Sequence, residues 1–152
     1  METSADTGGD ILVFSTGVLE IKQSIEAIRA AVPSHALSSL LILPLHANLT
    51  SQEQTSVFRP TPAGKRKIVV ATNVAETSIT IDGIIYVVDC GRVKENAFDP
   101  ETGITRLVEC WTSRAGCRQR RGRAGRTRPG ICYKLFTHCE LSSELDAAAT
   151  LD

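Results

Sequence analysis

Seven arginines and no acidic residue lie within the 15 residues from Arg114 to Arg128. Arginine side chains hold phosphate oxygens through paired hydrogen bonds and keep their charge at any working pH. Positions 119–126 read QRRGRAGR, and the glycines there let backbone approach a bulky polyphosphate. Gln119 could orient an attacking water, and an arginine could neutralise charge that develops on a transferred phosphoryl group. The string predicts phosphate binding, with a basic helix that grips an acidic neighbour as the alternative.

A second segment, positions 71–83, is dense in hydroxyl groups and reads ATNVAETSITIDG. Thr72 and Asn73 follow an apolar run, where they could hold the phosphates of a nucleic acid. Asp82 could accept a hydrogen bond from a ribose hydroxyl, as an acid near a nucleotide often does. Plain turn and capping chemistry is the alternative for this segment, and the arginine string beside it favours the phosphate interpretation.

The composition is that of one ordinary globular domain, which would carry both the arginine string and the hydroxyl-rich segment. The chain has 152 residues, of which 42% are hydrophobic and 22% charged, and its formal net charge is zero. Outside the arginine-rich 15 residues, ten basic and 17 acidic groups remain, a net charge of −7. A cationic face on an acidic body is typical of proteins that bind a nucleotide or a nucleic acid. A solvated charge run is the commoner explanation in general. The composition excludes a coiled coil, a collagen-like chain, a disulfide scaffold and a membrane protein.

Short apolar runs alternate with helical patterns along the chain. Runs at 11–14, 40–43, 68–70 and 84–88 are continuous, as in strands that are buried on both faces of a parallel sheet. The less apolar run at 130–136 predicts a further strand nearer an edge. Helices are expected at 18–32, where Pro33 stops the pattern, and from about Ser51 to Phe58 behind a Thr50–Glu53 capping box. A third helix should begin after Ser113 and carry the arginines.

These elements predict an α/β fold, a parallel sheet flanked by helices, with a β-hairpin at about 92–110 that projects beyond the sheet. Ligands of open parallel sheets gather in loops after the carboxyl ends of strands. We therefore expect three loops to meet there: the one after Phe14, the one after Val70, and the arginine string itself.

The five cysteines, Cys90, Cys110, Cys117, Cys132 and Cys139, have no CxxC spacing. They are interpreted as reduced, mostly buried thiols of an intracellular protein, because the polar, acidic start of the chain does not resemble a secretory signal. Whether the protein works in the nucleus or the cytoplasm is left open. A zinc site from Cys132, His138 and Cys139 is a poorly spaced alternative, and no metal site is predicted.

Several of these segments match motifs of one family, the DEAH-box ATP-dependent RNA helicases. The string at 119–126 resembles the QRxGRxGR box, motif VI, and 71–83 resembles motif V. Positions 11–17, ILVFSTG, resemble motif IV, and 44–49, PLHANL, with Gln54 and Phe58 resemble the next element of the same domain. The resemblance runs from about Gly9 to Phe136. It is to the second RecA-like domain, the C-terminal half of the helicase motor.

The resemblance implies roles for the matching residues. Arg123 and Arg126 would act as arginine fingers on the γ-phosphate of ATP, and Gln119 would help to position the hydrolytic water. Nucleotide contacts would come from four further positions: Asp82, Thr80, Phe58 and Gly122. RNA phosphates would touch Thr16, Thr72 and Asn73. The hairpin resembles the strand-separating hairpin of these helicases.

The chain carries neither a Gly-x-x-x-x-Gly-Lys-Ser/Thr loop nor an Asp-Glu-Ala-His box. In the family both belong to the first RecA-like domain, which would hold Mg²⁺ and complete the ATP site. The expected organisation is a flexible segment at 1–9, the motor domain at 10–136 and an acidic, frayed tail at 137–152. We expect an enzyme only as part of a two-domain motor that binds ATP and RNA, and negligible hydrolysis by the isolated chain. The alternative is a non-catalytic RNA- or partner-binding module left by truncation.

Overall fold

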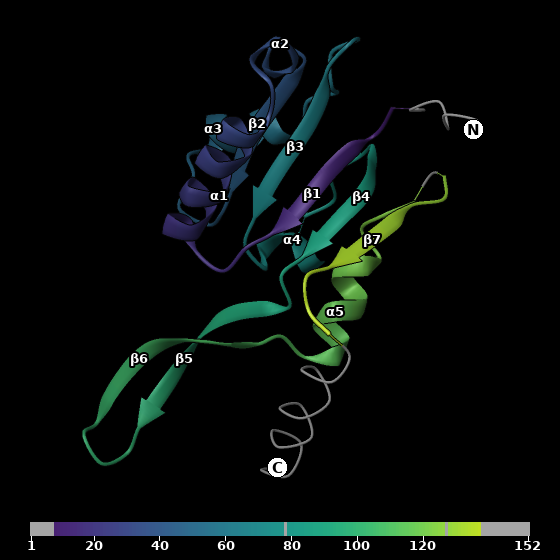
Figure 1. Cartoon of the computed structure of the whole chain (residues 1–152). Coiled ribbons are helices and arrows are strands. Elements are labelled where there is room, and N and C mark those ends of the chain that lie inside the picture. Colours follow the sequence, from purple (N-terminus) through teal and green to yellow (C-terminus); the bar gives the residue numbers. More distant parts are fainter. Residues whose placement is uncertain (1–7, 78, 127, 138–152) are drawn as a thin grey trace.

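Five strands form one fully parallel sheet in the order β2-β3-β1-β4-β7 (Figure 1). They are β1 (Asp10–Phe14), β2 (Leu40–Leu45), β3 (Arg66–Ala71), β4 (Ile84–Asp89) and β7 (Ile131–Lys134). The predicted apolar runs are confirmed as strands, and the least apolar, β7, lies at an edge as expected. The structure is a computed structural model that describes residues 8–77, 79–126 and 128–137.

The helices follow their local signals. They are α1 (Val18–Ala31), α2 (Ser34–Leu37), α3 (Ser51–Phe58), α4 (Val74–Thr77) and α5 (Arg114–Arg121). Both halves of the Thr50–Glu53 capping box form at the start of α3, and the Ser113 side chain accepts the Gly116 amide at the start of α5. The three predicted helices are confirmed. The sequence prediction missed the one-turn helices α2 and α4, which are too short to show a helical period.

Helices cover both faces of the sheet. Because neighbouring residues of a strand point to opposite sides, each face has its own apolar core. On one face, Ile42, Ile68 and Val70 pack with Ile21 of α1. On the other face, Leu12 and Phe14 belong to a core that includes Val57 of α3 and Ala75 of α4. Of the apolar residues of α1, Ile21 is buried, while Val18 at its start is 47% exposed.

The predicted hairpin is present and leaves the sheet beyond the end of β4 (Figure 1). Strands β5 (Arg92–Asp99) and β6 (Ile104–Trp111) pair antiparallel, with Arg92 opposite Trp111 and Asp99 opposite Ile104. The tip closes through a bond from the Gly103 amide to the Asp99 carbonyl at 2.8 Å. Most side chains of the outer part of the hairpin are exposed, including Phe98 and Leu107.

Candidate functional site

Residues predicted to touch RNA come together at the carboxyl ends of the central strands. In the register of β1 with β3, Phe14 pairs with Ala71, and the Ser15 amide donates to the Ala71 carbonyl at 2.7 Å. The residues that follow the two strands therefore lie in adjacent loops, and these include Thr16 and Thr72. Both are half-buried, while Asn73 is exposed. Two of the three loops expected at this edge thus meet there.

The segment that follows Thr72 crosses from this edge of the sheet to the other. It forms α4 against the sheet and then reaches the amino end of β4, where the Gly83 carbonyl accepts the Asp10 amide at 2.9 Å. Asp82 consequently lies at the edge opposite Thr72 and Asn73. A single motif of 13 residues supplies side chains to both ends of the sheet.

A cavity of about 370 Å³ opens at this amino edge. Phe58, the last residue of α3, and Asp82 both line it, although 23 residues separate them in the chain. The other lining residues are Gly9, Asp10, Arg59, Pro60, Thr61, Lys65, Gly83 and Arg128. Phe58 is 43% exposed, so its ring can be covered by a ligand. Thr80 is exposed and lies outside this cavity.

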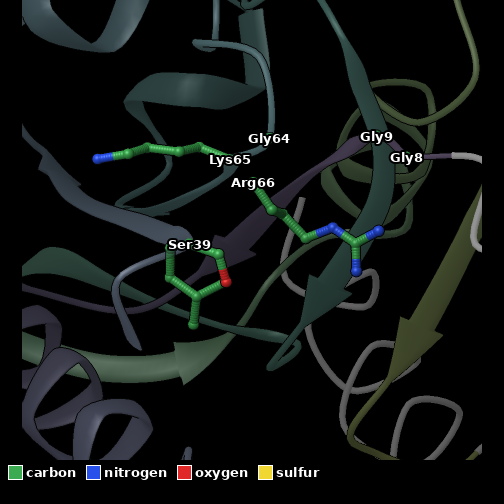
Figure 2. A pocket seen from close by; sticks show the side chains of 7 residues that line it. Gly8, Gly9, Ser39, Gly64, Lys65 and Arg66 are labelled. Carbon is green, nitrogen blue, oxygen red and sulfur yellow. The ribbon is translucent and has the colours of Figure 1, made fainter. Parts of the chain in front are cut away.

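A second cavity, of about 360 Å³, adjoins the first at the same edge and shares Gly9 and Lys65 with it. Figure 2 shows Lys65 and Arg66 on its wall with their charged ends pointing apart, and Gly8 and Gly9 on the neighbouring strand start. The Arg66 guanidinium lies 5.9 Å from the Tyr86 ring centroid. Both cavities thus open at the amino edge of the sheet.

The arginine string does not end where we expected it. Helix α5 begins close to the carboxyl end of β4, beyond the hairpin, where the Thr112 amide donates to the Gly91 carbonyl. Its eight residues rise about 12 Å, and the following loop reaches the amino end of β4, where the Gly125 amide donates to the Ile84 carbonyl at 3.2 Å. The prediction that the whole string joins the carboxyl-end loops is therefore wrong. A helix antiparallel to the strands carries its last residues to the opposite edge.

Arg120, inside this string, is fully buried. Its Nε donates to Glu76 Oε1 and its Nη1 to Asp89 Oδ1, both at 2.8 Å, and Nη2 donates to the Arg92 carbonyl at 3.1 Å. Its guanidinium lies 4.8 Å from the centre of the Phe14 ring. Burial works against the charge, but the bonds and charges of Asp89 and Glu76 outweigh it and raise the pKa of Arg120. This arginine joins α5 to α4, β4, β1 and the base of the hairpin.

The two predicted arginine fingers, Arg123 and Arg126, follow α5 and differ in environment. Arg123 is half-buried and donates to the Ile79 carbonyl at 3.3 Å and to the Glu76 carbonyl. Its Nε is buried with no partner among the described residues. Burial and the charge of Arg126 lower the pKa of Arg123. Arg126 is exposed, and Gln119 is exposed on α5.

The conformation and close packing of the chain account for the two glycines of the string. Gly125 has φ of +74°, and a Cβ there would come within 2.6 Å of the Gly130 backbone nitrogen. Its lack of a side chain is thus required by the turn into β7. Gly122 ends α5 in helical geometry, and a Cβ there would come within 3.3 Å of the Arg118 carbonyl. The role of Gly122 in nucleotide binding stays a prediction.

Comparison with known proteins decides what this arrangement belongs to. The profile of the family described as helicase conserved C-terminal domain matches residues 2–128. This chain belongs to that family. Its predicted likeness to DEAH-box RNA helicases is thereby confirmed at the level of the family and its relatives.

Relatives of this helicase domain carry matching names. It is 63% identical over 132 residues to a putative DEAH-box ATP-dependent helicase of Mycosarcoma maydis, which covers 87% of this chain and 8% of that protein. It is 50% identical over 139 residues to the pre-mRNA-splicing factor ATP-dependent RNA helicase prp22 of Schizosaccharomyces pombe, 90% of this chain and 12% of that one. The chain thus spans about a tenth of the length of these curated relatives.

A solved structure confirms the predicted fold of the helicase domain. The crystal structure of the E. coli DExH-box NTPase HrpB matches 90% of this chain, and 16% of its own, with a TM-score of 0.81 at 41% identity. The fold is the RecA-like α/β sheet that the sequence predicted, with the antiparallel hairpin attached.

The alternative of an acidic neighbour for the arginine helix applies to Arg120, but the sequence did not identify Asp89 and Glu76 as its partners. Asp89 is fully buried and closes the apolar strand β4, and its Oδ1 also accepts the Gly91 amide at 2.8 Å. Glu76 lies in α4 and presents its carboxylate to Arg120. A carboxylate at the end of five apolar residues is a signal that a buried cation must face it, because an unpaired buried charge is costly.

The cysteines of the helicase domain are less buried than predicted. Cys117 is buried, whereas Cys90, Cys110 and Cys132 are half-buried, and all four are free thiols. Burial raises the pKa of the thiols of Cys117 and Cys132. For the zinc alternative, His138 and Cys139 lie outside the described residues, as do most of the predicted terminal segments. Within the described part of the chain, no three His, Cys, Asp or Glu side chains gather into a metal site, and no helix is long and apolar enough to cross a membrane.

Proposed function

We propose that this helicase C-terminal domain is the second half of an ATP-driven RNA motor. ATP would bind between its amino-edge cavity and a first RecA-like domain, and RNA would run along its carboxyl edge. The observation that carries the proposal is the division of the motif residues: Phe58 and Asp82 line one cavity at the amino edge. Thr16 and Thr72 lie in adjacent loops at the other edge.

On the nucleotide side, Phe58 would stack on the base and Asp82 would accept a ribose hydroxyl, with Thr80 on the ribose side. The cavity volume of about 370 Å³ lies at the lower end of the range of ligand pockets, roughly 300–1,000 Å³. Such a space suits a base and a sugar better than a whole triphosphate. The phosphates would then extend toward the partner domain, which supplies the rest of the site.

Arg126 and Arg123 would stabilise the charge that develops on the γ-phosphoryl group, and Gln119 would position the attacking water. Arg126 supports this role because it is exposed, and within the described residues no hydrogen bond or ion pair holds its guanidinium. Arg123 has an unpaired buried Nε but also donates to the Ile79 carbonyl. Mg²⁺, which neutralises phosphate charge when it is bound, is assigned to the first domain, whose acidic motif this sequence lacks.

Motion would pass between the two edges through the segment from Thr72 to Asp82. Arg123 contacts this segment from the nucleotide side, and Thr72 and Asn73 are its RNA end. Closure of the two motor domains around ATP, and reopening after hydrolysis, would then step RNA that both domains hold. We expect the motor to act inside the cell, with the RNA and the pathway set by parts beyond this domain.

The test is to place this chain in a complete motor. The matching 132 residues of the Mycosarcoma maydis helicase are replaced by this chain, and RNA-stimulated ATP hydrolysis is measured. We expect turnover in the chimera, and a fall in kcat of about 1,000-fold for Arg126→Ala, the size expected for an arginine finger. The matched control is Arg29→Ala, an exposed arginine in the last turn of α1 on the opposite face of the sheet.

Retention of kcat in the Arg126→Ala chimera would remove the finger assignment. The isolated 152-residue chain, assayed in parallel, should hydrolyse ATP negligibly with or without RNA. RNA binding by the isolated chain that is steeply salt-dependent and indifferent to ATP, together with an inactive chimera, would favour the non-catalytic binding module instead.

A further inference from the structure

A buried lysine holds the end of α3, where Phe58 lies. Lys67, the second residue of β3, is 2% exposed. Its Nζ donates to the Val57 carbonyl at 2.7 Å and to the Arg59 carbonyl at 2.8 Å. These are the carbonyls on either side of Phe58. One ammonium group therefore fixes the backbone of the residue that lines the cavity.

A buried carboxylate holds the same segment a few residues further on. Asp10, 7% exposed at the start of β1, accepts the Thr61 hydroxyl at 2.5 Å through Oδ2 and the Lys67 amide at 2.9 Å through Oδ1. The stretch from Val57 to Thr61 is thus tied to two central strands of the sheet. Phe58 lies within the tied stretch.

Packing alone does not require a lysine at this position. A buried ammonium loses hydration, and burial accordingly lowers the pKa of Lys67, while the charges of Asp10 and Asp82 oppose that effect. An apolar side chain of the same length would fill the space without this cost. What the lysine adds is a partner for the Val57 carbonyl in the last turn of α3 and for the carbonyl of Arg59 just after it, and a positive charge at the negative end of the helix dipole.

We propose that Lys67 is a positioning residue for nucleotide binding, which holds Phe58 at the mouth of the amino-edge cavity so that its ring can receive the base. The proposal rests on the base-stacking role of Phe58 in the proposed function. Lys67 does not line the cavity, whereas Phe58, Arg59 and Thr61 do. Its two hydrogen bonds therefore act on the base through the segment that they tie.

The experiment compares two substrates in the chimeric motor, ATP and ribose 5-triphosphate, which lacks only the base. Lys67→Met keeps the length of the side chain and removes both hydrogen bonds. We expect the KM for ATP to rise about tenfold, within the range of base–aromatic stacking, with kcat changed less than twofold. The KM for ribose 5-triphosphate should stay unchanged. Lys67→Arg, which keeps a donor and a charge, should recover most of the loss.

A double-mutant cycle shows whether Lys67 acts through Phe58. Phe58→Ala should raise the KM for ATP by a similar factor, and Lys67→Met added to it should raise the KM no further. If Lys67→Met does not fold, Thr61→Val, which removes the hydroxyl that Asp10 accepts, takes its place in the same cycle. Lys22→Met, at an exposed position of α1, is the matched control and should leave both constants unchanged.

Each outcome separates the inference from the proposed function. Equal losses with the two substrates, or independent effects in the cycle, would overturn the positioning role and leave Lys67 as part of the fold. A raised KM for Phe58→Ala with an unchanged KM for Lys67→Met and Thr61→Val would overturn the inference alone. An unchanged KM for Phe58→Ala would remove the base contact of the proposed function and the inference with it.

Discussion

Arg120 and Arg126 belong to the same string, six residues apart, and have opposite environments. Arg120 lies in α5, fully buried, and its guanidinium donates to Glu76, Asp89 and the Arg92 carbonyl. Arg126 lies in the loop after α5 and is exposed to solvent. The helix half of the string anchors the hairpin and α4 to the sheet, and the loop half presents charge at the amino edge.

This difference teaches that one motif contains both a buried arginine that holds the fold together and an exposed arginine that a ligand can reach. A buried guanidinium is tolerated only when carboxylates and carbonyls pair with it, and its burial then keeps it out of reach of a ligand. An exposed guanidinium keeps its donors for phosphate. Substitutions in the helix half should therefore lower the stability of the domain, and substitutions in the loop half should lower the turnover of the motor.

The largest effect on stability is expected for Arg120→Met. The change leaves the Asp89 carboxylate buried beside an apolar side chain, with the Gly91 amide still donating to it. Breaking a buried pair by removing one partner costs roughly 3–5 kcal/mol of unfolding free energy. Urea unfolding followed by circular dichroism measures it on the isolated chain.

Arg118→Met and Arg126→Ala are the comparisons for that measurement. Both residues are exposed, so each substitution should change the unfolding free energy by no more than about 0.5 kcal/mol. If Arg126→Ala destabilised the chain as much as Arg120→Met, the division of the string into two halves would be wrong.

A smaller effect is expected for Gly125→Ala, which tests whether the loop half needs its fixed position. The substitution forces a Cβ against the Gly130 backbone at a φ of +74°. A non-glycine residue in such a conformation costs about 1–3 kcal/mol. We expect that loss in urea unfolding and, in the chimera, a fall in kcat that Gly64→Ala does not share, because a Cβ at Gly64 meets no atom within 4 Å although its φ of +77° is similar. An equal fall in kcat in both variants would contradict the need for a fixed position of the loop half.

The smallest effect concerns a half-exposed ion pair that also anchors the hairpin. Glu20 of α1 accepts from Lys94 of β5 at 2.5 Å, and the two side chains are 30% and 27% exposed. Glu20→Gln should cost at most about 1 kcal/mol at neutral pH, since solvent screens such pairs. The contrast with Arg120→Met measures what burial adds to an ion pair.

The pH dependence of that pair has a definite sign. The hydrogen bond from Lys94 lowers the pKa of Glu20 below its ordinary value of 4.5. The stabilisation is therefore present above that value and is lost as the pH falls through the lower, folded pKa. The stability difference between the wild-type chain and Glu20→Gln should shrink on acidification, and a difference that grew would contradict the assignment.

Most elements of this fold could be predicted because their signals are local. The apolar runs, the stop at Pro33, the Thr50–Glu53 box and the cap at Ser113 each lie within a few neighbouring residues. The RecA-like class followed from the motifs and from the alternation of strands with helices. The one-turn helices α2 and α4 could not be predicted, since four residues show no period.

The candidate site was predictable in its residue types and only partly in its arrangement. Thr16 and Thr72 follow neighbouring strands, so a parallel sheet already places them together. The path of α5, by contrast, could not be predicted, because the number of residues in the chain does not say at which edge of the sheet a helix after a long hairpin ends. The cavity that joins Phe58 to Asp82 also depends on tertiary structure, because 23 residues separate the two in the chain.

The sequence by itself determined which groups this protein offers for chemistry: an arginine string, hydroxyl-rich loops and a sheet to hold them. The tertiary structure decided which of these groups remain free for it. Arg120 donates its hydrogen bonds to carboxylates 31 and 44 residues away in the chain, and the Lys67 ammonium donates to carbonyls eight and ten residues away. Burial depends on such distant partners, because a charged group leaves water only where the fold brings its counter-charge or its hydrogen-bond acceptors to meet it.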